Sequence, residues 1–278
     1  MIKIQRAKLR VSIAFCVILA LVLPVFLAGC IGGDKETIEI KGSTTLLPFV
    51  EAAAQEYMDQ NSDVKITVSG GGSGTGITAI GEGTVDIGMS SRELKSSEVA
   101  AYPNLVTHVV AKDGLAIIVN TGNNVSGLTK DQVKQIYNGS ITNWNQVGGA
   151  SGTIVVVGRD STSGTRGTFD ELVLGSGTPV TTMEELASNG AIYEKLKNTP
   201  GAIGYVGLGY IDSNVKALPI NGVSPSIATV QDGTYPIARN LNLYTNGAPT
   251  GAVKDFIDFL MSKEGQAIIE AEGFVPIA

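Results

Sequence analysis

The sequence predicts an α/β fold, because short apolar runs alternate along the chain with segments whose apolar residues recur at helical spacing. Three β-type runs, at residues 37–40, 64–68 and 154–157, each lead through a turn rich in glycine and hydroxyl side chains into a helical pattern. This alternation predicts a parallel or mixed sheet. Because ligands bind beyond the carboxyl ends of strands in such sheets, we expect these turns to belong to a common site.

The turn after residues 154–157 has the features of an anion site. Arg159 ends the strand, and Ser163, Gly164 and Thr165 begin an amphipathic helix. The first turn of a helix leaves backbone N–H groups without partners and carries partial positive charge, which favours an anion. A guanidinium presents donors that suit a tetrahedral oxyanion. The alternative is an ordinary capped helix beside a surface arginine, and this turn alone does not decide between them.

The two earlier turns carry the same residue types. Ser43, Thr44 and Thr45 precede a helical pattern that runs from Leu46 to Met58, and Ser73 lies in a glycine-rich turn that precedes another. Glycine lets the backbone approach a ligand closely, while Ser or Thr caps a helix and donates to an oxygen. Convergence of the three turns would form one anion pocket.

The N-terminus predicts export. Four basic residues within positions 3–10 precede an apolar run at 11–28, which ends in the Leu-Ala-Gly-Cys sequence of residues 27–30. This pattern predicts a lipoprotein signal peptide at residues 1–29, cleavage before Cys30, a lipid on that thiol and a polar tether over residues 30–36. The alternative is an uncleaved membrane anchor, since the run approaches spanning length. Either way, the remainder lies outside the cytoplasm.

Cysteine usage and charge exclude several functions. With Cys16 inside the signal peptide and Cys30 acylated, no cysteine is left for a disulfide, a metal site or thiol catalysis. Without the four basic residues of the signal peptide, 16 basic residues face 26 acidic ones, a net charge of −10. This balance argues against nucleic acid as a partner. An anionic ligand would be bound by local hydrogen bonds and dipoles against the field of the whole protein.

A further strand is predicted at residues 85–89. The next residues, Ser90, Ser91 and Arg92, are expected to cap a helix that extends through Val99, so Ser91 and Arg92 are candidates to face the site. For Arg92 a solvated charge at the helix end is the preferred interpretation. Two strands follow, at residues 105–111 and 115–119, and the first contains His108, the single histidine, which we interpret as structural.

The second half of the chain predicts a mixture of helices, strands and loops. A short helix at residues 129–137 precedes a turn-rich segment that contains Trp144, for which a structural role is preferred. The later predictions are a helix at 182–196 with Met183, Leu186 and Ile192 inward, a strand entered from a tight turn at 200–206, a polar loop at 222–235, a strand at 241–244, a helix at 253–261 broken near Gly265, and a short last helix through residues 268–269.

Several motifs together resemble a known family. They are Gly-Ser-Thr-Thr at 42–45, Gly-Ser-Gly at 72–74, Val-Asp-Ile-Gly at 85–88, Ile-Tyr-Asn-Gly at 136–139 with Trp144, the segment 159–165, and the segment 200–205. In this order they resemble the phosphate-binding proteins of ABC importers, the PstS family, within the periplasmic-binding-protein type 2 fold. The resemblance covers nearly the whole chain after the signal peptide.

The resemblance implies two α/β lobes joined by a two-stranded hinge. Lobe I would comprise residues 37–114 and 236–278, and lobe II residues 115–235. Phosphate would lie in the cleft and be captured by hinge closure, then delivered to the membrane permease of an ABC importer at the outer face of the cytoplasmic membrane. The protein would be lipid-anchored and monomeric, and would need no cofactor and no metal. The residues implied as phosphate ligands are Ser43, Thr44, Thr45, Ser73, Ser91, Arg159, Ser163, Gly164 and Thr165.

One position departs from the family pattern. Family members commonly place an aspartate, which accepts a hydrogen bond from protonated phosphate, where this chain has Ser91. A carboxylate only accepts and therefore repels sulfate, whereas a serine hydroxyl can donate or accept. Asp160 could supply the acceptor or simply orient Arg159. The prediction of a tetrahedral oxyanion is therefore stronger than that of phosphate, and sulfate, arsenate or a phosphonate are alternatives.

Other functional classes fit the sequence less well. A secreted hydrolase would need a nucleophile elbow or a metal cluster, and the sequence has neither Gly-x-Ser-x-Gly nor a His/Cys/Asp cluster. The nearest dinucleotide motif, residues 74–79, lacks the context of a cofactor site, and no phosphate-binding loop with Gly-Lys-Ser/Thr occurs. A binding fold that has lost its ligand remains an alternative. We therefore do not expect this protein to be an enzyme.

Overall fold

The computed structural model describes residues 35–175 and 177–277. The predicted signal peptide, Cys30 and most of the tether lie outside the described residues, so the anchor stays a prediction. The described residues belong to one compact unit. Within them, every helix is too short or too polar to cross a membrane.

The first three strands form a parallel group, as the sequence predicts. β1 (Glu36–Gly42) pairs in parallel with β2 (Val64–Ser69) on one side and with β3 (Ile87–Ser90) on the other. α1 (Leu47–Gln60) follows β1 and α2 (Ser73–Gly81) follows β2. Because the three strands run in parallel, their carboxyl ends share one edge of the sheet.

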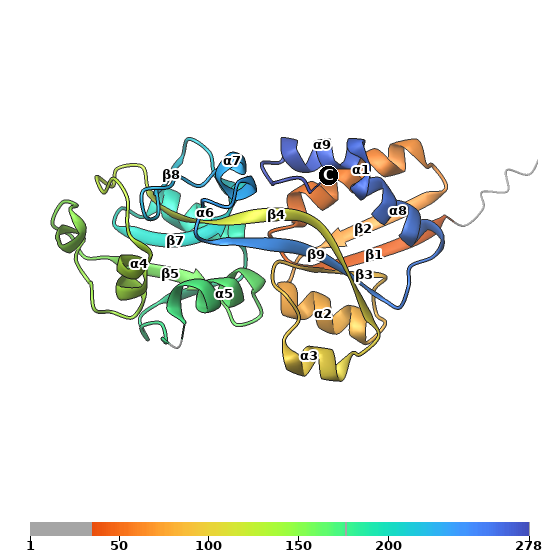
Figure 1. Cartoon of the computed structure of the whole chain (residues 1–278), viewed down its shortest axis with the longest axis horizontal. Coiled ribbons are helices and arrows are strands. Elements are labelled where there is room, and N and C mark those ends of the chain that lie inside the picture. The colour runs from red at the N-terminus through yellow and green to blue at the C-terminus, as the bar shows by residue number, and fades with distance from the viewer. Residues whose placement is uncertain (1–34, 176, 278) are drawn as a thin grey trace, which may run out of the picture. The chain divides into compact units, whose positions relative to one another are not determined.

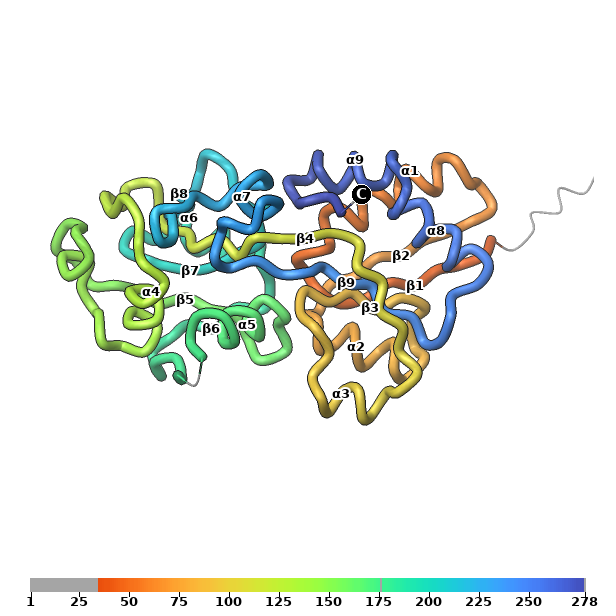
Figure 2. The backbone as a smooth tube through the Cα atoms, in the orientation of Figure 1, coloured from red at the N-terminus to blue at the C-terminus, as the bar shows by residue number. Residues whose placement is uncertain are grey.

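Two long strands continue the sheet beside β3. β4 (Leu105–Asn120) and β9 (Ala238–Asn246) pair antiparallel, from Leu105 opposite Asn246 to Gly114 opposite Ala238, and Figures 1 and 2 show them running side by side. β9 also pairs antiparallel with β3. The two strands predicted at 105–111 and 115–119 are thus a single strand that contains Asp113.

The far part of the sheet contains a second parallel group. β5 (Val155–Arg159) pairs in parallel with β6 (Glu184–Leu186) and with β7 (Ala202–Gly207), and β7 pairs antiparallel with β4. β8 (Val215–Ala217) pairs with another stretch of β4. The sheet is therefore mixed, with the order β2-β1-β3-β9-β4-β7-β5-β6.

The remaining helices are mostly short. They are α3 (Ser96–Ala101), α4 (Lys130–Tyr137), α5 (Gly164–Phe169) with its π-helical continuation (Asp170–Leu174), α6 (Asn189–Asn198), α7 (Ile227–Gln231), α8 (Gly251–Met261) and α9 (Lys263–Ala271), with single 3-10 turns at Trp144–Val147 and Leu208–Tyr210.

The apolar core falls into two sets of clusters that meet along β4 and β9. Clusters built from residues 38–111 and 241–274 surround β1, β2, β3, α1 and α8. Clusters built from residues 115–237, together with Val275, surround β5, β7, α4 and α6. The change from one set to the other comes between Ala111 and Leu115 on β4, and between Ile237, just before β9, and Leu241 on β9.

Some sequence predictions of local structure are wrong. The predicted helix at 182–196 is β6 followed by α6, which starts only after the cap Ser188, because Leu186 pairs with Arg159 as a strand residue. The predicted loop at 222–235 contains α7. α3 begins at Ser96 rather than at Ser91, and the break between the last two helices lies at Ser262, which caps α9.

Candidate functional site

The first two hydroxyl-rich turns meet at the carboxyl edge of the first parallel group. The Ser43 hydroxyl donates to Ser91 Oγ at 3.0 Å, and the Ser91 N–H donates to Ser73 Oγ at 3.0 Å. Gly42 makes the first turn possible, since its φ is +144° and an added Cβ would lie 2.2 Å from the carbonyl oxygen of Met89. Residues after β1, β2 and β3 thus share one small volume.

The third turn packs directly against the first two. Thr165 Oγ1 lies 3.0 Å from Thr45 Oγ1, and the N–H of Gly74 donates to the carbonyl oxygen of Thr162 at 2.9 Å. An added Cβ at Gly164 would lie 2.1 Å from Ser73 Oγ. Ser163 caps α5 by accepting from the N–H of Arg166 at 3.2 Å. The predicted convergence of the three turns is confirmed, while the ligand roles of these residues stay predictions.

Arg159 is buried, so the alternative of a surface arginine is wrong. Its side chain donates from Nε to the carbonyl of Leu186 at 3.0 Å and from Nη2 to that of Ala187 at 2.9 Å. Burial lowers the pKa of Arg159, and the neighbouring carboxylate of Asp160 opposes the shift. One oxygen of that carboxylate, Oδ1, accepts from the N–H and the hydroxyl of Thr162, and both roles considered for Asp160 stay predictions.

Aromatic packing fixes the strand that carries Arg159. The Arg159 N–H donates to the Tyr205 hydroxyl at 3.1 Å, and the Tyr205 ring stacks on Phe169 of α5 with centroids 4.2 Å apart. Tyr137 of α4 donates to the carbonyl of Val157 at 2.9 Å and packs against the same two rings. β5 and the start of α5 are therefore held by one buried aromatic cluster.

Asn189, which was not predicted from the sequence, joins Arg159 to the first turn. Its amide oxygen faces Arg159 Nη1 at 3.3 Å, an orientation required because a guanidinium nitrogen only donates. The same oxygen lies 3.0 Å from the hydroxyls of Thr44 and Thr45. Asn189 follows β6 and the cap Ser188, so it belongs to a fourth strand-to-helix turn, which the wrong helix prediction at 182–196 concealed.

Arg239 and Asp113 form a buried ion pair beside these residues, and neither was predicted. Arg239 Nη2 lies 2.7 Å from Asp113 Oδ2, with side-chain exposures of 4% and 0%. Arg239 also donates to Thr45 Oγ1 at 3.2 Å and to the Ser91 carbonyl at 3.3 Å. Burial raises the pKa of Asp113, while Arg239 and the Leu208 N–H oppose that rise. The sequence did contain a signal for Asp113, because it is a charged residue between two apolar runs.

Three residues singled out in the sequence lie outside this network. Arg92 is buried and pairs with Glu98 at 2.7 Å, so the expectation of a solvated charge is wrong. His108 Nε2 lies 2.8 Å from Thr245 Oγ1 within the sheet, and the Trp144 indole donates to the Gly201 carbonyl at 2.9 Å. Both contacts are the structural roles that the sequence predicts.

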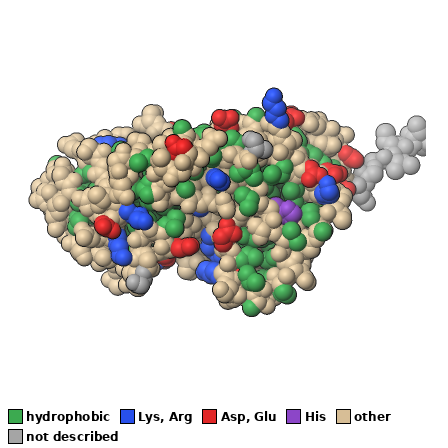
Figure 3. Space-filling view, in the orientation of Figure 1, with side chains coloured by type: hydrophobic (Ala, Val, Ile, Leu, Met, Phe, Trp, Pro, Cys, Tyr) green, Lys and Arg blue, Asp and Glu red, His purple; other side chains and the backbone are tan. Residues whose placement is uncertain are grey.

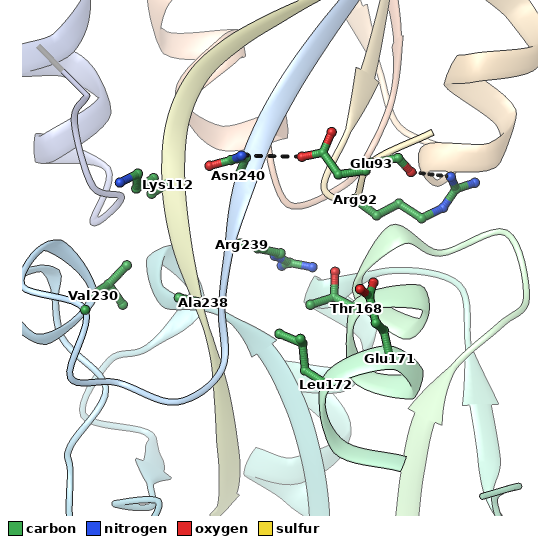
Figure 4. Close-up of a pocket in the computed structure, with 11 residues that line it drawn as sticks. Arg92, Glu93, Lys112, Thr168, Glu171, Leu172, Val230, Ala238, Arg239 and Asn240 are labelled. Atoms are coloured by element: carbon green, nitrogen blue, oxygen red, sulfur yellow. Dashed lines mark hydrogen bonds between the residues drawn. The ribbon is translucent and has the colours of Figure 1, made fainter. Parts of the chain in front are cut away.

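A cavity of about 410 Å³ adjoins the network on the side of β9. Figure 4 shows Arg239 at its centre, between Arg92, Thr168 and Glu171. The nine predicted ligand residues do not line this cavity, and two of its lining residues contact them: Arg239 reaches Thr45 and Ser91, and the Thr168 hydroxyl donates to the Ser91 carbonyl at 3.1 Å. On the face seen in Figure 3, basic and acidic side chains are interspersed rather than gathered into a patch of one sign.

The network is rich in donors. Of the two carboxylates beside it, Asp113 accepts from Arg239 and from the Leu208 N–H, and Asp160 accepts from Thr162. The other groups of the network are hydroxyls, the Arg159 guanidinium, the Asn189 amide and the start of α5. Such a set stabilises a dehydrated oxyanion through charge-assisted hydrogen bonds.

Comparisons with known proteins agree with this chemistry. Residues 32–264 match the family model described as a PBP superfamily domain, which makes the chain a member of that class of binding proteins. It is 39% identical to the phosphate-binding protein PstS of Bacillus subtilis over 243 residues, which cover 87% of this chain and 81% of that one. The chain belongs to the PstS family of phosphate-binding proteins.

Solved structures agree with the family assignment. A candidate phosphate ABC transporter substrate-binding protein from Clostridium perfringens, solved with bound phosphate, is similar at a TM-score of 0.83 and 35% identity, over 87% of this chain and 100% of that one. An ABC-type phosphate transport receptor from Vibrio cholerae is similar at a TM-score of 0.72 and 34% identity, over 86% and 100% of the two chains. The α/β fold predicted from the sequence is therefore that of the periplasmic-binding-protein type 2 structures.

Proposed function

We propose that this protein captures inorganic phosphate outside the cytoplasm and delivers it to the permease of an ABC importer. Family members are transport receptors rather than enzymes, and this chain is one of them. The observation that carries the proposal is the meeting of three hydroxyl-rich turns with a buried guanidinium. The phosphate ligands that we propose are Ser43, Thr44, Thr45, Ser73, Ser91, Arg159, Ser163, Gly164 and Thr165.

The binding energy would come from local donors. Each charge-assisted hydrogen bond contributes roughly 1.5 to 3 kcal/mol, so several of them reach the ~12 kcal/mol of nanomolar binding after the cost of association. α5 and its continuation supply backbone N–H groups and a dipole, Arg159 supplies a fixed positive charge, and the threonine and serine hydroxyls supply directional donors. The surrounding burial keeps water from competing with these contacts.

Capture would proceed by closure of two lobes. We assign residues 37–114 and 236–278 to one lobe and residues 115–235 to the other, with β4 and β9 as the hinge. The division of the apolar core at Ala111/Leu115 and Ile237/Leu241 supports these boundaries. Phosphate that contacts Thr45 from one lobe and Thr165 from the other would stabilise the closed form, because only that form makes both sets of contacts.

The location follows from the N-terminal sequence. The basic and apolar segments before Cys30 support a lipid anchor on the outer face of the cytoplasmic membrane, with residues 30–36 as a tether. A monomer that moves on this tether would present the closed lobes to the permease.

Titration calorimetry on residues 34–278 tests the proposal. Phosphate should bind one to one with a submicromolar dissociation constant, whereas a nucleotide or an uncharged sugar should not bind. Because Ser91 replaces the usual aspartate, sulfate and arsenate are titrated in parallel. Failure of all three oxyanions to bind would exclude the proposed site, and release of a product from a phosphate ester would indicate an enzyme instead.

A further inference from the structure

We propose that Arg239 is a positioning residue of the anion site, which fixes the Thr45 hydroxyl as a donor toward the ligand. This inference rests on the proposed function of the site. It concerns a residue on β9, far in sequence from the three turns, and it assigns a role to the Arg239–Asp113 pair.

The hydrogen-bond pattern around Arg239 carries the argument. Arg239 Nε and Nη2 donate to Asp113 Oδ2 at 2.9 and 2.7 Å, and Asp113 Oδ1 accepts from the Leu208 N–H at 2.9 Å. The guanidinium is therefore clamped by a carboxylate that is itself fixed to the backbone. A clamped guanidinium loses little further freedom when it donates again.

The direction of the next bond follows from chemistry. Arg239 Nη2 lies 3.2 Å from Thr45 Oγ1, and a guanidinium can only donate, so the hydroxyl oxygen must accept. The single proton of that hydroxyl then points to an acceptor elsewhere. In this structure the neighbours of Thr45 Oγ1 are Asn189 and Thr165, each 3.0 Å away, and in the proposed complex the acceptor would be the anion.

A purely structural ion pair would not need these extra contacts. Arg92 provides the comparison, since it is buried like Arg239 and pairs with Glu98 at 2.7 Å. Its guanidinium donates to Glu98 and to the backbone carbonyl of Glu93, not to a proposed ligand residue. Arg239 instead reaches both Thr45 and the carbonyl of Ser91.

The test is a double-mutant cycle between Arg239 and Thr45, read by phosphate titration and by urea unfolding of residues 34–278. Arg239→Gln and Thr45→Val should each weaken phosphate binding at least tenfold. If Arg239 acts through Thr45, the double variant should bind phosphate less than about threefold more weakly than Thr45→Val alone. The same loss in both backgrounds would overturn the proposal.

Two further variants keep the test decisive. Because Arg239→Gln leaves Asp113 buried without its partner, the neutral pair Arg239→Gln with Asp113→Asn is measured as well, and it should show the same weakened binding. Arg92→Gln should lower stability while phosphate affinity stays within about twofold. Unchanged affinity in the neutral pair would overturn the role of Arg239, whereas absence of phosphate binding by the parent protein would instead reject the proposed function.

Discussion

Thr45 Oγ1 lies 3.0 Å from Thr165 Oγ1, although 120 residues separate the two threonines in the chain. Thr45 follows β1 in the first parallel group, and Thr165 lies in the first turn of α5, after β5 of the second group. Their contact joins the two parts of the sheet at the oxyanion site that we propose. Each hydroxyl can donate to an oxygen in that position.

Replacement of Thr165 by valine should weaken phosphate binding by ~1 to 3 kcal/mol, because it removes a hydroxyl donor and leaves a partner unsatisfied in a buried site. Thr165→Ser keeps the hydroxyl and should retain most of the affinity. Titration calorimetry on both variants measures the difference. Equal affinities for the valine and serine variants would show that this hydroxyl does not contact the ligand.

Replacement of Arg159 by alanine should weaken phosphate binding by ~2 to 5 kcal/mol, as expected when one partner of a buried charged contact is removed. Arg159→Lys keeps the charge but loses the two bonds to the carbonyls of Leu186 and Ala187, so we expect an intermediate affinity. Urea unfolding measures the loss of stability separately. Phosphate binding that survives Arg159→Ala unchanged would place the site elsewhere.

The strands and the hydroxyl-rich turns could be predicted from the sequence because each has a local signal. β-branched runs predict β2 and β5, and the Ser-Gly-Thr segment before apolar residues predicts α5. The convergence of these turns could be inferred because parallel strands bring their carboxyl ends to one edge. The local sequence pattern was therefore enough to predict the site residues that directly follow a strand.

Residues that reach the site from inside a strand could not be predicted in this way. Arg239 belongs to β9 and Asp113 to β4, and their pairing depends on a register set by long-range strand contacts. Asn189 was missed for a different reason, since Met183, Leu186 and Ile192 fit a helical spacing although the first part of the segment is a strand. The burial of Arg92 could not be predicted locally, because its side chain also packs beside Gly74 and Gly167, which belong to other turns and helices.

Replacement of Gly164 by alanine should lower both stability and phosphate affinity. The added Cβ would lie 2.1 Å from Ser73 Oγ and 2.7 Å from Ser91 Oγ, so those turns must move apart, at a cost of ~1 to 3 kcal/mol in unfolding free energy. Gly152→Ala is the matched control, because nothing lies within 4 Å of its added Cβ. Equal urea midpoints and affinities for the two variants would contradict this packing.

Acid should weaken the fold partly through Glu98. Burial raises the pKa of this carboxyl, but hydrogen bonds from the Arg92 guanidinium and the Lys95 N–H outweigh that effect, and the pKa is lowered overall. A carboxyl with a lowered pKa stabilises the fold above its unfolded-state pKa, and this contribution is lost as the pH falls through the folded-state value. In Glu98→Gln, the free energy of unfolding measured in urea should therefore fall less steeply as the pH is lowered. An equally steep fall in the variant and the parent protein would contradict this assignment.

Replacement of Ser91 by aspartate should make the site discriminate against sulfate. Ser91 Oγ accepts from the Ser43 hydroxyl at 3.0 Å and lies 3.4 Å from Ser73 Oγ, so a carboxylate there would be held by two hydroxyls. It would accept the proton of hydrogen phosphate and repel sulfate, which has none. In the parent protein, where Asp113 and Asp160 are both engaged, we expect sulfate to compete with phosphate. Competition titrations at mildly acidic and neutral pH should show the sulfate affinity of Ser91→Asp falling at least tenfold relative to phosphate. An unchanged ratio of sulfate to phosphate affinity would mean that another group in the site already accepts a hydrogen bond from the protonated ligand.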